Sequence, residues 1–365
     1  MLSNDISTKI LNVGPDYVTN KGGMPAAIKM YSKLYNPFQF IPTYFAKKGI
    51  SAHILSLRQI FVIYMYLLRN TQIQVVHIHG ASKGSFYRKY IIFLLSKYLF
   101  GKKVVYHVHS GAFPVFFNNS NLVVKTCIRH FINTTDAVIC LSDFWKGFFS
   151  QTFKPKELLV LRNMVEHVSC ENYTRRFENT GDGKVIFLFL GMIREQKGTF
   201  DMVRAASMLD EKYKNAFEIW IAGDGEVEAL KRSISEHNLD SNIKYLGWLD
   251  GEDKNQVLRK ANVLVLPSHF EGSPVSILEA MAYGMPIISS NVGGIPELVI
   301  DDYNGILNRP GDTAAIRDSF LFFLENKEQL KLFGINSLKI SKKHHVSSVF
   351  PSICTVYSNM ISTNL

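Results

Sequence analysis

Short runs of consecutive apolar residues recur along the chain and alternate with stretches of helical periodicity. Runs such as 263–266 (VLVL) are typical of strands buried on both faces of a parallel sheet. The predicted strands are 9–14, 74–79, 103–109, 137–141, 158–161, 184–190, 217–222, 243–246, 263–266 and 287–288. Predicted helices between them include 26–34 and 58–70. This alternation predicts an α/β protein with two doubly wound, Rossmann-like domains that face one cleft.

A polar, turn-rich segment separates the two halves of the chain. Residues 169–183 (SCENYTRRFENTGDG) lack the apolar runs found on either side, so we interpret them as an interdomain linker. A length of 365 residues suits two domains of ordinary size. We therefore predict an N-terminal domain over residues 1–170 and a C-terminal domain over residues 171–345.

The stretch 262–299 has the order strand, loop, helix, strand, loop. Pro274 suits the first turn of a helix after the strand 263–266, and Pro296 marks a second predicted helix start. The amino ends of two such helices would present free amides and positive dipole ends to one crevice. Such a crevice suits a diphosphate.

Two carboxylates stand in the same stretch. Glu271 lies in the loop, and Glu279 follows eight positions later inside the predicted helix. A carboxylate does not bind phosphate, but it accepts hydrogen bonds from sugar hydroxyls. Phosphate-binding amides beside hydroxyl-binding acids indicate a nucleotide-sugar as the ligand.

The same stretch resembles the signature of the retaining glycosyltransferases of family 4, which have the GT-B fold. The match is a Glu-x(7)-Glu pair within a longer frame, in register at Glu271, Gly272, Pro274, Leu278, Glu279, Ala280, Met281, Ala282, Gly284, Pro286, Gly293, Gly294 and Glu297. The basic, aromatic N-terminal half suggests a glycan or polyprenyl-linked acceptor in cell-surface polysaccharide biosynthesis. The resemblance implies transfer of a hexose from a UDP- or GDP-sugar to that acceptor. It also implies retention of anomeric configuration and no cofactor or required metal, and the sequence has no DxD motif near the site.

The resemblance assigns roles to residues of the C-terminal half. Glu271 would hold the hydroxyls of the donor sugar, together with the residues that follow it, Gly272, Ser273, Pro274 and Val275. Glu279 would hold the ribose. In the segment GMIREQKG, Lys197 would bind the diphosphate; Met192 stands where the family has arginine, and Arg194 lies two residues on, either as its replacement or as a solvated loop cation.

Further expected donor contacts come from both halves. Gly247 and Trp248 follow a strand, and Trp248 would stack on the base or simply pack. In the N-terminal, acceptor-binding half, the family's donor-facing loop matches Gly22 and Gly23, its donor-sugar histidine matches His109, and its asparagine matches Asn163. With His109, the expected catalytic residues are Glu271, Lys197 and Arg194. Residues 346–365 resemble the family's closing helix, which crosses back onto the first domain.

Charge is distributed unevenly along the chain. The formal net charge is +10, and between Tyr17 and Thr135 there are 15 Lys and Arg but no Asp or Glu. Four explanations suit a basic N-terminal half: an anionic membrane surface, an anionic acceptor, nucleic acid, or a charge bias that only increases solubility. Residues 85–103 mix basic and aromatic side chains, which suits a helix at a membrane interface or one packed on the sheet with a basic rim.

The cysteines, the N-terminus and the lengths of the apolar runs bear on where the protein works. The four cysteines form no CxxC pair, no basic region precedes an apolar core at the N-terminus, and no apolar run is long enough to span a bilayer. We expect a cytoplasmic enzyme, peripheral at the inner face of the plasma membrane, that binds no nucleic acid. Two alternatives remain: a sugar-nucleotide epimerase of similar architecture, and a non-catalytic nucleotide-sugar or RNA binder.

Overall fold

The computed structural model describes residues 1–45, 50–168 and 183–361 and divides the chain into two compact units. The first unit contains residues 1–164 together with 347–365, and the second contains residues 165–346. The predicted linker lies almost entirely outside the described residues. No described helix combines the length and the apolar character needed to cross a bilayer.

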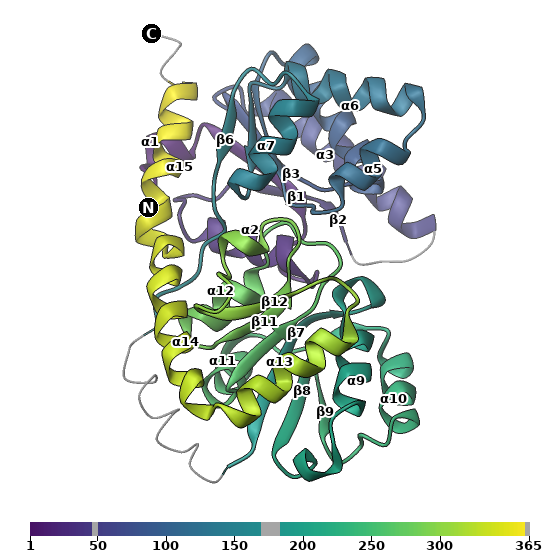
Figure 1. Cartoon of the computed structure of the whole chain (residues 1–365). Coiled ribbons are helices and arrows are strands. Elements are labelled where there is room, and N and C mark those ends of the chain that lie inside the picture. The colour runs from purple at the N-terminus through teal and green to yellow at the C-terminus, as the bar shows by residue number, and fades with distance from the viewer. Residues whose placement is uncertain (46–49, 169–182, 362–365) are drawn as a thin grey trace. The chain divides into compact units, whose positions relative to one another are not determined.

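The first unit is built on a six-stranded parallel sheet, of which β1, β2, β3 and β6 are labelled in Figure 1. The strand order is β2-β1-β3-β4-β5-β6. The strands are β1 (Ile10–Pro15), β2 (Phe40–Tyr44), β3 (Val75–Gly80), β4 (Lys103–Val108), β5 (Ala137–Cys140) and β6 (Leu158–Val160). The connecting helices are α1 (Asn4–Ser7), α2 (Gly23–Ser32), α3 (Ile50–Arg69), α4 (Gly84–Leu94), η1 (Leu95–Leu99), α5 (Phe113–Asn119), α6 (Leu122–Thr134) and α7 (Asp143–Thr152).

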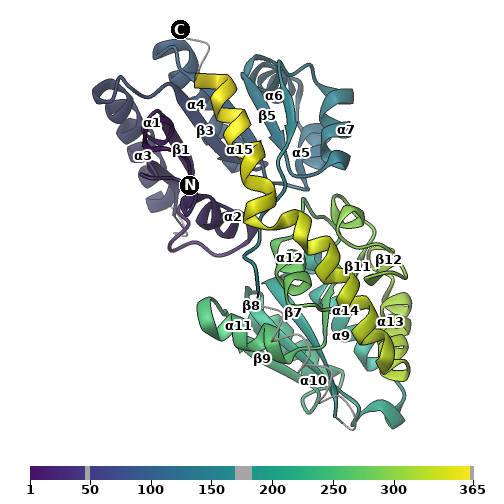
Figure 2. The same cartoon turned by 90° about the vertical axis from the view of Figure 1, so that its left-hand side faces the viewer.

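The two faces of this sheet differ in chemistry. One face packs against apolar side chains of α3, α4 and α6, such as Ile63, Phe93 and Phe131. The opposite face carries His77 and His107, whose rings meet Tyr31 of α2 edge to face. The last helix, α15 (Val346–Ile361), runs across this second face (Figure 2). The hydroxyl of its Tyr357 hydrogen-bonds His77 Nδ1.

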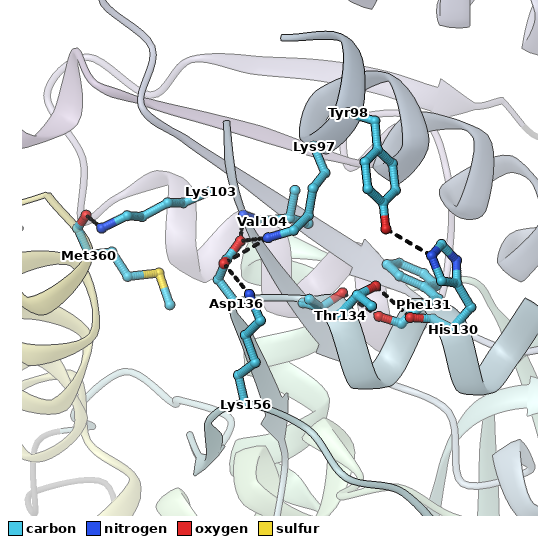
Figure 3. A network of polar contacts seen from close by, with 11 residues as sticks. Lys97, Tyr98, Lys103, Val104, His130, Phe131, Thr134, Asp136, Lys156 and Met360 are labelled. Atoms are coloured by element: carbon cyan, nitrogen blue, oxygen red, sulfur yellow. Dashed lines mark hydrogen bonds and ion pairs between the residues drawn. The ribbon is translucent and has the colours of Figure 1, made fainter. Parts of the chain in front are cut away.

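Hydrogen bonds of Asp136 and Lys103 join separate elements of the first unit. Asp136 accepts hydrogen bonds from Lys97 Nζ at 2.8 Å and from the Val104 amide at 2.8 Å, which joins η1, β4 and the start of β5 (Figure 3). Lys103 Nζ donates to the carbonyl of Met360 at 2.7 Å and so holds α15 to β4.

The second unit has its own six-stranded parallel sheet, in the order β12-β11-β10-β7-β8-β9. The strands are β7 (Val185–Ile193), β8 (Phe217–Gly225), β9 (Ile243–Gly247), β10 (Val263–Leu266), β11 (Ile287–Ser290) and β12 (Gly305–Asn308). The helices are η2 (Glu195–Lys197), α9 (Thr199–Ser207), η3 (Glu211–Tyr213), α10 (Val227–Glu236), α11 (Gly251–Lys260), α12 (Val275–Ala282), η4 (Ile295–Glu297), α13 (Thr313–Glu325), α14 (Lys327–Ser341) and η5 (Lys342–His344).

Two expectations about elements need correction. No α-helix begins at Pro296: the chain makes the single 3₁₀ turn η4 and then enters β12. Only 14 residues separate Ser290 from Gly305, so the crossover to the neighbouring strand has little length for an α-helix. In addition, the apolar pattern did not reveal β2 or β12, which are edge strands of four or five residues.

Candidate active site

Lys197 is positioned by the glycine that follows it. Gly198 has φ +69°, in the left-handed region that favours glycine. A Cβ at this position would lie 2.0 Å from the carbonyl oxygen of Pro267, at the end of β10. The η2 turn and the loop after β10 therefore approach each other only because residue 198 is glycine.

The close approach brings two predicted site residues together. Lys197 Nζ lies 2.5 Å from Glu271 Oε1, and the Ser268 hydroxyl donates to the same oxygen at 2.8 Å. The Glu271 side chain is only 7% exposed, whereas that of Lys197 is 30% exposed. A buried carboxylate requires such partners, and the ammonium group remains within reach of a solvent-borne ligand.

The loop after Glu271 is fixed at both ends. Gly272 accepts a hydrogen bond from the Gly294 amide at 3.0 Å, which joins it to the loop after β11. Ser273 and Pro274 follow, both buried, and Val275 begins α12. The expected sugar-binding loop thus leads directly into a helix N-terminus, whose free amides favour anions.

Glu279 lies on α12 and is paired. Its Oε1 is 2.6 Å from Nζ of Lys254 on α11, and both side chains are about a quarter exposed. Sequence reasoning did not identify Lys254, because nothing in the polar helix GEDKNQVLRK marks one cation above another. The pair carries no net charge, and a ribose hydroxyl that binds Glu279 has to share the carboxylate with Lys254.

A second buried acid near this loop also escaped sequence analysis. Asp201, on α9, has a 4% exposed side chain, and its Oδ2 lies 2.7 Å from Nε2 of His269. Its Oδ1 pairs with Arg204. The His269 amide donates to the carbonyl of Gln196 at 2.9 Å, so this network braces the backbone between the η2 turn and Glu271.

Arg194 and the pair Gly247–Trp248 occupy the carboxyl ends of strands in the same unit. Arg194 precedes η2 with an exposed side chain, and its carbonyl accepts from the Lys197 amide at 3.0 Å. Gly247 ends β9 with φ +75° and has no atom within 4 Å of where a Cβ would stand, and Trp248 follows, partly buried. The structure therefore places these residues at the predicted strand ends; their roles toward a ligand stay predictions.

Four expected site residues lie in the first unit. Gly22 caps α2 with φ +119°, Gly23 is the first residue of α2, and nothing crowds either one. Asn163 is buried just before the unit ends. His109 follows β4, where its amide donates to the Gly80 carbonyl at 2.9 Å.

His109 belongs to a row of histidines on β3 and β4. Its Nε2 lies 3.1 Å from Nδ1 of His79, and burial lowers the pKa of His109 to about 3. Burial also lowers the pKa of His77 to about 3 and the pKa values of His79 and His107 well below the usual range. All four rings are therefore neutral near pH 7 and act as hydrogen-bond donors and acceptors rather than as cations.

Three of these rings meet a geometric requirement for a metal ion. His77, His79 and His107 each offer a nitrogen, and these atoms lie within 4.8 Å of one another. The rings are already occupied in part, since His77 Nε2 lies 3.3 Å from His107 Nδ1. Lys89, which is also buried, lies close enough to lower the pKa of His79, and burial lowers the pKa of Lys89 itself well below its usual range. The three rings are held by hydrogen bonds to one another, to His109 and to Tyr357.

Comparison with protein families accounts for both halves of the chain. The model of the glycosyl transferases group 1 matches residues 172–339, and the model of glycosyltransferase family 4 matches residues 37–167. The chain belongs to glycosyltransferase family 4. The family resemblance predicted from the sequence is confirmed.

Curated relatives of this glycosyltransferase span several bacteria and an archaeon. An uncharacterized glycosyltransferase of Methanocaldococcus jannaschii is 27% identical over 246 residues, which is 66% of each chain. An uncharacterized 41.2 kDa protein of the cps region of Klebsiella pneumoniae is 26% identical over 312 residues, or 82% of this chain and 84% of the relative. The amylovoran biosynthesis glycosyltransferase AmsK of Erwinia amylovora is 35% identical over 136 residues, about a third of each chain.

Solved structures share the architecture at low sequence identity. Sucrose-phosphate synthase from Thermosynechococcus elongatus superposes with a TM-score of 0.80 over 98% of this glycosyltransferase and 100% of that chain, at 14% identity. HepE of Anabaena in complex with UDP-glucose has a TM-score of 0.75 over 96% and 99%, at 16% identity. The predicted GT-B class with two Rossmann-like units is confirmed.

Proposed function

We propose that this glycosyltransferase transfers a hexose from a UDP- or GDP-sugar to a glycan or lipid-linked acceptor, with retention of configuration and without a required metal. One observation carries the proposal: the ion pair between Lys197 and Glu271, held beside the N-terminus of α12. The pair sets a partly exposed cation, which can meet the leaving group, next to a buried acid, which can meet the sugar.

The chemistry follows from where charge develops. When the bond from the anomeric carbon to the diphosphate breaks, negative charge grows on the diphosphate and positive character grows on the sugar. Lys197 and the free amides of α12 can stabilise the first, and Glu271 lies near enough to Lys197 to serve the second. Arg194 would add a second cation from the exposed loop. Glu279 would bind the ribose.

The relatives support the donor and pathway classes. HepE has been solved with UDP-glucose, and two relatives are named for a cps region and for amylovoran biosynthesis. The basic N-terminal half suits an acceptor carried at an anionic membrane. We therefore propose that the enzyme works on surface polysaccharide at the inner face of the plasma membrane.

Donor binding is tested by a thermal-shift panel of UDP, GDP, ADP and NADH. A ligand at 100 times its Kd stabilises the native state by about 2.7 kcal/mol, which is a visible shift. We expect one of UDP and GDP to stabilise the wild type and to lose most of its effect with Lys197→Ala. The matched control is Lys231→Ala, which removes an exposed lysine paired with Glu228 in the same unit. No shift with any diphosphate, or an equal loss in the control, contradicts the proposal.

Transfer itself requires a second assay. The enzyme is incubated with labelled nucleotide-sugars of the nucleotide that stabilises it and with a membrane extract, with and without EDTA. The released nucleoside diphosphate and the labelled glycolipid are both measured. Release of diphosphate with an α-linked product from an α-linked donor supports retention. A product that is still a nucleotide-sugar would instead indicate the epimerase.

A further inference from the structure

The outward faces of α3, α4 and η1 in the first unit are apolar, although they are exposed. On α3, Ile54, Phe61 and Leu68 recur every seven residues and so form one stripe, and their side chains are 61%, 62% and 51% exposed. The inward side of the same helix is buried through Ile63 and Leu67. The helix therefore lies flat against the unit and presents a hydrophobic stripe outward.

The neighbouring helix continues this surface. α4 packs beside α3 and exposes Tyr87 and Ile91, and η1 extends it with Tyr98 and Leu99, which are 59% and 60% exposed. The hydroxyl of Tyr98 lies 2.8 Å from His130 Nε2, so its ring is held in place at the surface (Figure 3). A soluble protein seldom exposes a contiguous apolar area of this kind without a partner.

The charges within this surface have one sign. Arg58 and Arg69 are exposed on α3, and Arg129 is exposed on α6, which packs against α4. The sequence has no Asp or Glu between Tyr17 and Thr135, so no acid lies on any of these helices. The partner must therefore bring both apolar material and negative charge.

We propose that the exposed face of α3, α4 and η1, called here the docking face, binds an anionic lipid membrane. A second copy of the chain is disfavoured, because a two-fold contact through this face would set its arginines against themselves. A bilayer with anionic headgroups supplies the missing charge, while side chains such as Phe61 and Leu99 enter the acyl boundary. The inference rests on the proposed function in one respect: membrane binding would bring the enzyme to a lipid-linked acceptor.

The test is co-sedimentation of the full chain with vesicles of phosphatidylcholine alone or with 30% phosphatidylglycerol, at low and physiological salt. Leu57 lies one turn before Phe61 on α3 and is 67% exposed. Two double variants probe the face: Leu57→Gln with Phe61→Gln, and Arg58→Gln with Arg69→Gln. Their matched controls lie in the second unit. Met208→Gln with Leu332→Gln removes two exposed apolar side chains, and Lys214→Gln with Lys231→Gln makes the same change in net charge.

We expect wild type to bind the anionic vesicles and to release them as salt rises. Loss of the two arginines should weaken binding about twenty-five-fold, from a fivefold loss for each charge. Loss of the two apolar side chains should weaken it at least about tenfold. Equal binding to neutral vesicles, no binding, or equal losses in the controls overturns the proposal. Dimerisation that the Phe61 variant abolishes, without vesicle binding, would assign the face to a second copy.

The UDP and GDP thermal shift is measured on the same variants, because none of the substituted residues belongs to the candidate active site. An unchanged nucleotide shift with lost vesicle binding separates the docking face from the candidate active site. Vesicle binding without any nucleotide shift would leave the docking face standing and remove the proposed transferase activity.

Discussion

Lowering the pH from 7 to 5 is expected to destabilise the first unit, because its sheet buries the neutral rings of His77, His79 and His107, and the neutral His109 lies partly buried beside them. Burial lowers the pKa values of His77 and His109 to about 3, against about 6.5 in an unfolded chain. Between about pH 6.5 and pH 3 the unfolded chain binds protons on these histidines that the native state does not bind. The free energy of unfolding therefore falls as the pH falls through this window, and the stabilisation is fully present only above pH 6.5.

The magnitude follows from the same numbers. At pH 5, a histidine with a native pKa near 3 favours unfolding by about 2 kcal/mol relative to neutral pH. His77 and His109 together give about 4 kcal/mol, and His79 and His107 act in the same direction. Domains are stable by about 5–15 kcal/mol, so a large part of the stability should be lost. Asp136 also has a lowered pKa, but its contribution is lost only below about pH 4.

The assay uses the three tryptophans. Trp145 lies in the first unit, and Trp220 and Trp248 lie in the second, so the double variant Trp220→Phe with Trp248→Phe leaves a fluorescence reporter of the first unit alone. Urea unfolding is followed at pH 7, 6 and 5. His77→Gln should lower the dependence on pH by about one proton, or about 1.4 kcal/mol per pH unit near pH 5. A free energy of unfolding that stays level between pH 7 and 5 would refute the reasoning.

Three further outcomes are expected. Gly198→Ala should destabilise the second unit by at least about 2 kcal/mol in urea unfolding, because φ is +69° and the new Cβ meets the Pro267 carbonyl. The control is Gly147→Ala, inside α7, where nothing lies within 4 Å of the new Cβ, and it should not destabilise the first unit. Tyr357→Phe should cost the first unit about 1–3 kcal/mol by the Trp145 signal, because His77 Nδ1 loses its buried partner, and an unchanged midpoint would argue against that contact. Glu279→Gln should weaken binding of the stabilising nucleotide at least tenfold by calorimetry, through loss of charge-assisted hydrogen bonds to the ribose, whereas equal affinity would exclude a ribose contact.

The apolar runs determined much of the fold because parallel strands buried on both faces leave a local signal. Runs such as 137–141 and 263–266 became β5 and β10. The short edge strands β2 and β12 left no such signal. Their register depends on a neighbouring strand, as when Ile288 pairs with Ile306, and not on their own pattern.

The motif frame likewise singled out Lys197 and Glu271, but only the tertiary structure decided how they meet. These residues are 74 positions apart, and they pair because Gly198 admits the Pro267 backbone. Sequence analysis did not identify Lys254 and Asp201 for the same reason. Their importance comes from which side chains they meet in the folded chain, and the local sequence does not indicate that. The pattern could indicate which positions bear chemistry, while close packing of separate strand ends and helices determined which of those positions touch.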